Sequence, residues 1–299
     1  MKLIRNIFLA SITLVFFTAT SIAQGDIISA ADFMKVVKTN KSLVIIDASK
    51  ADAYTKTHIK NAVNIPHKSL YNETEIEGLL MDAPALAELF GSKGVSNDAE
   101  IVVYDGGSQK YSTRVYWILK YLGATNVKVL HKDMDQWRKS RVPITKMPTK
   151  AKTATFTPTI DATIMADLAY VKSGKAIVID ARAEDEFAGA TDKSKGHIPG
   201  AVNINYKDFL NDKEAFKTKA EIEAILKAKG ISESTPMVAY CQTSVRACVI
   251  YTAVVNVLGW NNIKVYDGAY NEWVAKGNKV DAKAGVSVSK TSPSSGGGC

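Results

Sequence analysis

The sequence predicts an α/β protein made of two tandem copies of one domain, each a parallel sheet flanked by helices. The chain repeats itself, short apolar runs alternate with helical patterns, and 299 residues suit two domains. Hydrophobic residues make up 46% of the chain and charged residues 23%, which excludes a disordered protein. The 3 cysteines exclude a scaffold held by several disulfides and a zinc site built from paired cysteines.

The repeat appears when the second half of the chain is compared with the first at an offset of 136 residues. At this offset Asp105 falls on Cys241, and the alignment runs without a gap for more than thirty residues. Further upstream, a His-Ile pair and an Ala-Val-Asn-Ile motif occur in both halves. We therefore expect domains at residues 27–146 and 160–280, a linker at 147–159 and a tail at 281–299.

Three apolar runs in each copy are predicted to be strands. Because they are apolar on both faces, they favour a parallel sheet covered by helices. In such sheets ligands bind at the carboxyl ends of the strands. The expected strands are residues 43–46, 101–104 and 127–130 in the first copy and 176–179, 237–240 and 263–266 in the second. The clearest helical patterns are residues 220–229 and 245–258.

The N-terminus has the pattern of a secretory signal peptide. Lys2 and Arg5 precede an apolar run at 7–17, and small residues at 21 and 23 favour cleavage after Ala23. The alternative is an uncleaved anchor, but the run is short for a membrane span. We expect residues 1–23 to be removed and the mature chain to be periplasmic or secreted, without a membrane segment.

The charge of the chain suits small anions better than nucleic acid. The formal net charge is +8, and no run of five or more basic residues occurs. A solvated basic surface accounts for this excess without any partner. Because two linked copies bury an interface between them, we expect a monomer.

The chemistry of the chain is expected in the loop that begins at Cys241. This cysteine follows a buried strand and precedes an apolar helix, so free backbone N–H groups and the helix dipole favour its thiolate. Arg246 adds a forked cation suited to an oxyanion. The loop residues expected to surround the substrate with Arg246 are Gln242, Thr243, Ser244 and Val245.

Four motifs give the chain its resemblance to a known family. They are Asp180-Ala181-Arg182, the Gly-His-Ile-Pro-Gly-Ala stretch at 196–201, the loop at 241–246 and the Asp-Gly-Ala-Tyr-Asn-Glu-Trp stretch at 267–273. Together they resemble the tandem rhodaneses, sulfurtransferases of the thiosulfate/3-mercaptopyruvate type. The resemblance covers nearly the whole mature chain.

The resemblance implies that the second copy is catalytic and the first is not, because Asp105 cannot carry sulfur. It implies a ping-pong reaction in which Cys241 takes sulfur from thiosulfate as a persulfide and passes it to cyanide or a thiol. It also implies that Arg182 contacts the site, and it implies no metal or organic cofactor. Related phosphatases have a loop one residue longer, so the spacing from Cys241 to Arg246 favours sulfur over phosphate.

The chain departs from the family pattern at several positions. Ser244 replaces the usual glycine, and Glu186 stands where vertebrate members carry a substrate-binding arginine. Arg246 would then supply the lost contact. Thr243 keeps open the use of 3-mercaptopyruvate, which in the family recruits a histidine from the inactive domain, here His58.

Other interpretations remain beside this one. The chain could be a persulfide carrier of low turnover or an interaction scaffold, whereas a phosphatase or arsenate reductase is disfavoured by loop length. Arg246 and Arg182 could form ion pairs instead of binding substrate.

The remaining aromatic and cysteine residues are interpreted structurally, with one exception. We interpret His197, Trp137, Trp273 and Cys248 as structural. Cys299, at the end of a linker-like tail, could reach Cys241 as a sulfur acceptor or resolving thiol.

Overall fold

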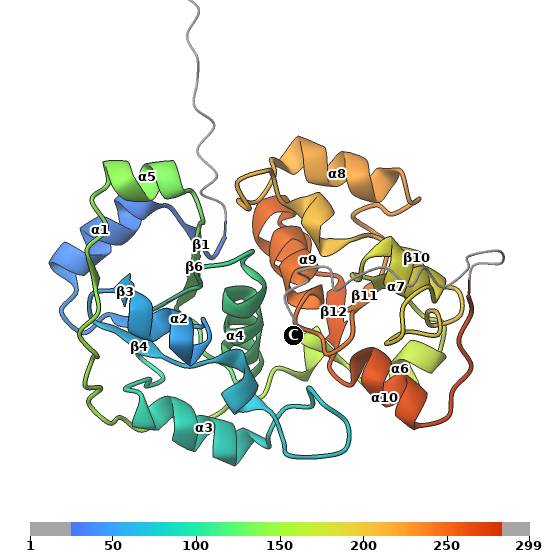
Figure 1. Ribbon diagram of the computed structural model, residues 1–299, viewed down its shortest axis with the longest axis horizontal. Helices are drawn as coiled ribbons and strands as arrows, with labels where there is room; N and C mark the ends of the chain where they lie inside the picture. The colour runs from blue at the N-terminus through green and yellow to red at the C-terminus, as the bar shows by residue number, and fades with distance from the viewer. Residues whose placement is uncertain (1–24, 283–299) are drawn as a thin grey trace, which may run out of the picture.

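The computed structural model describes residues 25–282 of the chain. The expected signal segment at 1–23 and Cys299 lie outside these residues. Figure 1 shows two α/β domains side by side, with helices α4 (Lys110–Tyr121) and α9 (Ala247–Ala253) facing each other between them. None of the helices within the described part is long and apolar enough to cross a membrane.

The first domain contains a parallel sheet of five strands in the order β1-β6-β5-β2-β4. Its strands are β1 (Ile27–Ile28), β2 (Val44–Asp47), β4 (Ala62–Asn64), β5 (Ile101–Tyr104) and β6 (Val127–Leu130). An antiparallel pair, β3 (His58–Ile59) and β7 (Ile144–Thr145), lies beside it. The helices are α1 (Ala30–Thr39), α2 (Ala51–Lys56), η1 (His67–Leu70), α3 (Ala83–Ser92), α4 and α5 (Met134–Lys139).

The second domain repeats this sheet in the order β8-β12-β11-β9-β10, again with parallel strands. Each strand therefore has the same neighbours as its counterpart, which confirms the predicted duplication. The strands are β8 (Met165–Ala166), β9 (Ile177–Asp180), β10 (Val202–Asn203), β11 (Met237–Tyr240) and β12 (Ile263–Tyr266). The helices are η2 (Ala162–Ile164), α6 (Leu168–Lys172), α7 (Glu184–Ala188), η3 (Tyr206–Phe209), α8 (Lys219–Lys227), α9, the π-helix η4 (Val254–Leu258) and α10 (Ala269–Ala275).

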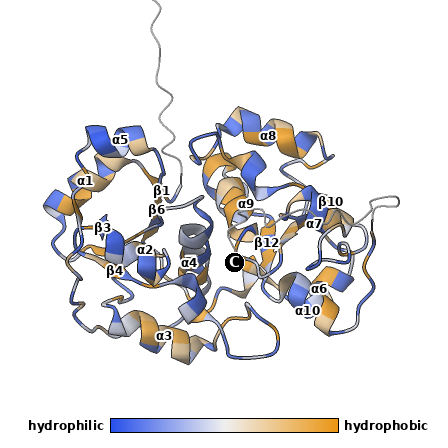
Figure 2. Cartoon of the chain, in the orientation of Figure 1, coloured by the Kyte–Doolittle hydropathy of each residue, from blue (hydrophilic) through white to orange (hydrophobic). Residues whose placement is uncertain are grey.

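The sequence explains where several helices begin. The Ser29 hydroxyl accepts the Asp32 N–H at the start of α1, and Asp82 caps α3 in the same way. At the start of α8, Thr218 and Glu221 form a reciprocal capping box. Figure 2 shows polar residues on the outer sides of these helices and apolar residues toward the sheets.

The predicted elements match the observed ones with small differences. Strands β2 and β9 begin and end one residue later than expected, and the helical pattern at 245–258 divides into α9 and a π-helical segment. The linker also packs more closely than a simple connector. Phe156 is buried, and the Ala154 N–H donates to the Gly91 carbonyl at 2.9 Å, so the linker covers the first domain.

The two tryptophans at equivalent positions have equivalent structural roles. Trp137 and Trp273 are both buried in small clusters on one face of their sheets. Their indole N–H groups donate to the carbonyls of His131 and Lys279, at 2.9 and 2.7 Å. Each ring therefore packs its apolar body while its one polar group is satisfied.

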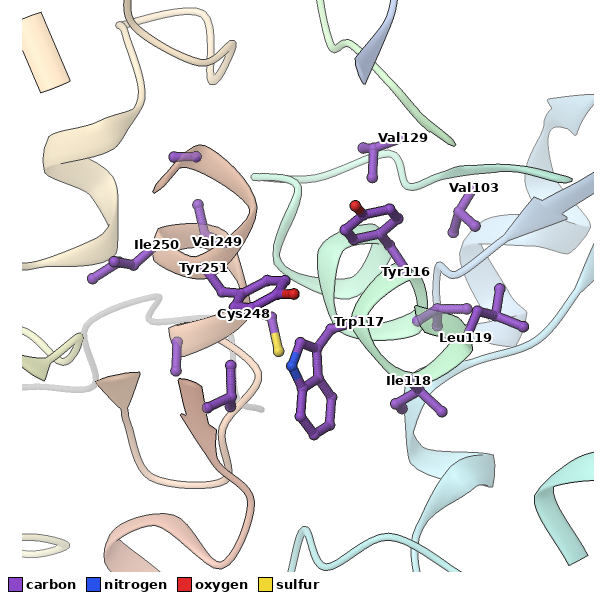
Figure 3. Packing of buried hydrophobic residues seen from close by; sticks show 14 of the residues in the cluster. Val103, Tyr116, Trp117, Ile118, Leu119, Val129, Cys248, Val249, Ile250 and Tyr251 are labelled. Atoms are coloured by element: carbon purple, nitrogen blue, oxygen red, sulfur yellow. The ribbon is translucent and has the colours of Figure 1, made fainter. Parts of the chain in front are cut away.

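The main hydrophobic core runs continuously from one domain into the other. It includes Trp117 and Leu119 of α4 together with Cys248, Val249 and Tyr251 of α9. Figure 3 shows side chains of the two helices meeting at this boundary. Because the apolar surface of each helix is buried by the other domain, hydrophobic burial holds the two copies together.

A buried ion pair also joins the domains. The Arg114 guanidinium on α4 lies 2.5 Å from the Asp267 carboxylate, which follows β12, and donates to the Gly78 carbonyl at 3.3 Å. The arginine side chain has no exposed surface. Burial alone would lower the pKa of Arg114, but the charge and hydrogen bond of Asp267, together with Tyr71 and Cys248, outweigh this and raise it.

Replacing Arg114 should lower the free energy of unfolding of the protein. Replacing it by methionine leaves the Asp267 carboxylate in a largely buried place without its cation, at an expected cost of about 3 kcal/mol in the free energy of unfolding. Urea unfolding followed by circular dichroism measures this. Lys120 on the same helix provides the control, because it pairs with Asp26 at 3.2 Å while both side chains stay partly exposed. Lys120→Met should cost less than about 1 kcal/mol, and equal losses in the two variants would contradict the prediction.

Candidate active site

The cysteine loop (residues 241–246) leaves the carboxyl end of β11, the central strand of the second sheet, and enters α9. All four residues of β11 are buried, and so is Cys241. The loop thus places the sulfur where the central strand ends and a helix begins. Backbone N–H groups in the first turn of a helix have no partners within the helix, so they stabilise negative charge there.

Backbone contacts fix the sulfur and the start of the loop. The Arg246 N–H donates to Cys241 Sγ at 3.3 Å. From the start of α10, the Tyr270 N–H donates to the Cys241 carbonyl at 3.0 Å. The neighbouring Gln242 is held twice by Asn271, through its backbone carbonyl and through its side-chain amide. Helix α10 therefore supports the loop from the side of β12.

Ser244 has the left-handed conformation, with φ at +64°. This conformation is costly for a residue with a Cβ atom, which explains why glycine is usual at this position in the resembling family. The side chain compensates, since its buried hydroxyl donates to the carbonyls of Tyr266 and Asp267 at the end of β12. Val245, which follows, is fully buried and anchors the loop in the core.

Arg246 pairs with the carboxylate of Glu186 in this structure. The two guanidinium NH groups donate to the two carboxylate oxygens at 2.5 and 2.8 Å. Burial alone would raise the pKa of Glu186, but the hydrogen bonds and charge of Arg246 outweigh this and lower it. From the sequence, Arg246 could either bind an anionic ligand or form an ion pair, and the structure shows the ion pair.

Arg182 does not reach the sulfur with a free guanidinium, so the expectation that it binds substrate is corrected. The side chain is fully buried, and it pairs with Asp180 at 2.7 Å. Its remaining donors bond the Ser194 hydroxyl and the Gly196 carbonyl. Because the Asp180 carboxylate already neutralises the cation, Arg182 ties β9 to the segment before β10 rather than serving a ligand.

In the first domain the carboxylate of Asp105 occupies the place that corresponds to the sulfur. It accepts the backbone N–H groups of Gly107, Gln109, Tyr111 and Ser112 at distances between 2.8 and 3.3 Å. The Asp105 carboxylate therefore accepts N–H groups of its own loop (the aspartate loop, residues 105–109) and of the residues that follow it. A carboxylate held there leaves no room for a bound anion, which explains in physical terms why this copy cannot perform the same chemistry.

The left-handed turn falls at different places in the two loops, although the sequences align without a gap. It is at Gln109, four residues after Asp105, in the first domain and at Ser244, three residues after Cys241, in the second, so it comes one residue earlier in the cysteine loop. The second helix absorbs the additional residue as the π-turn at η4. The earlier turn near Cys241 is thus accompanied by irregular helix geometry two turns further along.

The first domain contributes backbone directly to the cysteine loop. A Cβ atom on Gly78 would lie 2.6 Å from the Cβ of Thr243, so the glycine backbone packs against this side chain. From the same segment (residues 71–80), the Leu80 N–H donates to Asp267 at 3.2 Å. The Glu77 carbonyl accepts from Asn271 at 3.0 Å. The 71–80 segment therefore covers the loop and its supports.

The second domain covers the aspartate loop in return. Its segment after η3 places Glu214 so that the carbonyl accepts from Gln109 at 2.7 Å and the carboxylate lies 2.6 Å from Lys132. Lys132 in turn donates to the carbonyls of Gly106 and Gly107. The two domains thus exchange equivalent segments across their interface, each covering the other's loop.

His58 and His197 make equivalent structural contacts. The ring nitrogens of His58 contact the carbonyls of Tyr54 and Met147 at 2.7 and 3.0 Å, and the ring stacks on Tyr54. His197 stacks on Phe187 and contacts its carbonyl at 2.8 Å, so both equivalent histidines order the segment before a strand. These contacts support a structural role for His58 over a role at a mercaptopyruvate site.

Cys248 lies on α9 beneath the loop and is fully buried. The Arg114 guanidinium lies 4.0 Å from its sulfur. Burial raises the pKa of the Cys248 thiol to about 12, since the charge of Arg114 offsets the loss of hydration only in part. This thiol therefore stays protonated at neutral pH and packs as part of the core, in agreement with its interpretation from sequence.

Sequence reasoning missed the residues that the first domain supplies, chiefly Arg114 and Gly78, and their partner Asp267. Arg114 left one signal, a cation directly before the apolar run at 115–119. Gly78 left none, because its role depends on where the 71–80 segment crosses to the other domain. Among residues 25–282, no cluster of His, Cys, Asp and Glu side chains is arranged to hold a metal ion.

Comparison with known proteins agrees with this architecture. The model of the rhodanese-like domain matches residues 29–140 and 167–276. The chain is 28% identical to thiosulfate sulfurtransferase of Bos taurus over 264 residues, covering 81% of this chain and 89% of that protein. It is 32% identical to thiosulfate sulfurtransferase of Gallus gallus over 226 residues, covering 70% and 78%.

A solved structure shows the same fold. The crystal structure of SseA from Escherichia coli, described with the fold and mechanism of 3-mercaptopyruvate sulfotransferases, superposes with a TM-score of 0.73 at 24% identity. The match covers 82% of this chain and 98% of that one. With two matched domains and relatives along most of its length, the chain belongs to the rhodanese family and is a sulfurtransferase with two tandem rhodanese-like domains.

The conformation of Ser244 can be tested with two substitutions. Ser244→Ala keeps the strained backbone and loses the buried hydroxyl contact, at an expected cost of about 1 kcal/mol. Ser244→Gly also loses the hydroxyl but removes the Cβ penalty, so it should be about 1 kcal/mol more stable than the alanine variant. Urea denaturation curves measure both values. A glycine variant less stable than the alanine variant would show that the left-handed conformation carries no such cost.

Proposed function

We propose that the chain transfers sulfane sulfur from thiosulfate to a thiophilic acceptor, cyanide or a thiol, through a persulfide on Cys241. The observation that carries this proposal is the contrast between the two loops. In the second domain a cysteine sulfur accepts a loop N–H, whereas in the first a carboxylate takes the equivalent N–H groups for itself.

The first half of the reaction charges the enzyme with sulfur. The Cys241 thiolate attacks the outer sulfur of thiosulfate, a new S–S bond forms, and the S–S bond within thiosulfate breaks. Sulfite leaves with the bonding electron pair, and the terminal sulfur of the persulfide carries a negative charge. The Arg246 N–H and the first turn of α9 lie where they stabilise this charge.

In the second half an acceptor attacks the terminal sulfur, and the Cys241 thiolate leaves. With cyanide the product is thiocyanate, and with a thiol it is a persulfide of that thiol. The loop residues Gln242, Thr243, Ser244 and Val245 surround the sulfur in this scheme. The donors required are backbone groups, so the reaction needs no metal ion in our proposal.

A second donor, 3-mercaptopyruvate, has some support. The buried hydroxyl of Thr243 has no hydrogen-bond partner among the described residues, so it could serve a ligand. The surroundings favour thiosulfate, however, because the backbone of Gly78 lies against Thr243 and both ring nitrogens of His58 already contact backbone carbonyls. We therefore propose thiosulfate as the preferred donor.

Thiocyanate formation from cyanide tests the proposal, with thiosulfate and 3-mercaptopyruvate compared side by side. Cys241→Ser should lower turnover by a factor on the order of 10³ or more, since the nucleophile is lost. Cys248→Ser is the matched control and should keep most of its turnover. Faster turnover with mercaptopyruvate would reverse the proposed preference. Absence of turnover with a stable persulfide on Cys241, seen by mass spectrometry, would instead indicate a sulfur carrier.

We also propose that the mature chain is exported and monomeric. The N-terminal pattern at 1–23 supports export, and the exchange of segments between the two domains uses the surfaces that a second copy would cover. Expression of the full chain in a Gram-negative host should give a periplasmic protein that begins at Gln24 and has a monomer mass by light scattering. A chain retained in the membrane, or a dimer mass, would contradict these expectations.

A further inference from the structure

The ion pair between Arg246 and Glu186 involves the residue whose backbone N–H contacts the reactive sulfur. Arg246 contacts Cys241 Sγ through its backbone N–H at 3.3 Å and Glu186 through both outer nitrogens of its guanidinium. A single residue therefore connects the sulfur to a carboxylate on α7. An oxyanion that approaches the guanidinium end-on, with one hydrogen bond from each outer nitrogen, must use the donors that Glu186 now holds.

The carboxylate is built into the fold rather than lying on the surface by chance. Glu186 is in the first turn of α7, and its Oε2 accepts the Ala183 N–H at 3.2 Å. The pair is mostly shielded from solvent, with 13% of the Arg246 side chain and 21% of the Glu186 side chain exposed. Such shielding makes the pair stronger than a surface ion pair, while the remaining exposure leaves an approach to the guanidinium.

The contrast with Arg182 shows which cation a substrate could use. Arg182 has no exposed surface, and Asp180, Ser194 and Gly196 take its donors. Arg246 retains exposed surface and sits next to the sulfur. Glu186 therefore neutralises the guanidinium that an anionic donor would meet on reaching Cys241.

We propose that Glu186 is a specificity-determining residue that competes with the anionic sulfur donor for Arg246. This inference rests on the proposed function, in which the donor is thiosulfate. Thiosulfate that binds both outer nitrogens displaces the carboxylate, so its affinity is lower than the cation alone would give. Once the S–S bond breaks and sulfite leaves, Glu186 takes Arg246 back, which opposes the return of sulfite and the reverse attack on the persulfide.

Steady-state kinetics of Glu186→Gln test the competition. The amide keeps an oxygen for the Ala183 N–H but removes the charge, so the KM for thiosulfate should fall on the order of fivefold. Sulfite should inhibit at correspondingly lower concentrations. Asp192→Asn is the matched control, because Asp192 is an exposed carboxylate in the loop after α7, and it should leave both values unchanged. An unchanged KM and unchanged sulfite inhibition in Glu186→Gln would overturn the inference.

A double-mutant cycle assigns the effect to Arg246. In an Arg246→Met background, Glu186→Gln should no longer change the KM for thiosulfate, because the cation for which the two anions compete is gone. The same gain in both backgrounds would overturn the inference. Circular dichroism verifies folding of each variant, and Glu186→Asp, which keeps the charge, should retain a KM closer to that of the unaltered chain than Glu186→Gln does.

Alkylation of Cys241 separates this inference from the proposed function. Iodoacetate is an anion and iodoacetamide is neutral, so the ratio of their rates at Cys241 reports the charge beside the sulfur without any turnover. Peptide mass spectrometry measures each rate. The ratio should rise on the order of threefold in Glu186→Gln. A raised ratio in a chain inactive with thiosulfate would refute the proposed donor but support the role of Glu186, and an unchanged ratio would overturn that role.

Discussion

The contact between Arg114 and Asp267 is the interaction on which the site most depends. Asp267 follows β12, and its backbone carbonyl accepts the Ser244 hydroxyl at the left-handed turn of the cysteine loop. Arg114 comes from the other domain and is bonded to Gly78, which packs on Thr243. Because the pair is buried, its two members are costly to separate, and the domains are held at one spacing around Cys241. A domain without a cysteine thus remains necessary to the domain that has one.

The duplicated fold shows two solutions to one electrostatic problem. Each copy ends its central strand in a loop that leads into a helix, where backbone N–H groups without helical partners favour a negative group. In the first copy Asp105 supplies that partner permanently. In the second copy the left-handed turn comes one residue earlier, and the sulfur of Cys241 accepts the N–H there. The π-turn at η4 accommodates the residue that this shift adds to the helical segment. Whether a copy is reactive therefore depends on which side chain accepts the N–H groups of the loop.

Two arginines of the second domain show how positive charge is neutralised by carboxylates around the active site. Both Arg182 and Arg246 are paired with carboxylates, and the pairing differs mainly in its access to solvent. The contact to the sulfur that the structure shows comes from a backbone N–H, which is neutral overall and needs no counter-ion. A guanidinium held by Glu186 is available only to a ligand that competes for it, which links substrate preference to a single carboxylate.

The amino-acid sequence alone determined the duplication, three of the five parallel strands of each sheet, and the position of Cys241 between a buried strand and a helix, because these follow from local patterns that repeat. It also pointed to Ser244 and Glu186 as departures from a family pattern. Tertiary structure decided the partners of Arg246, Arg182 and His58, and the placement of Gly78 and Arg114 at the loop. These contacts join residues far apart in the chain or settle which of several nearby carboxylates an arginine meets, and a local pattern carries no information about that choice. The one-residue shift of the left-handed turn was hidden for the same reason, since the two sequences align there without a gap.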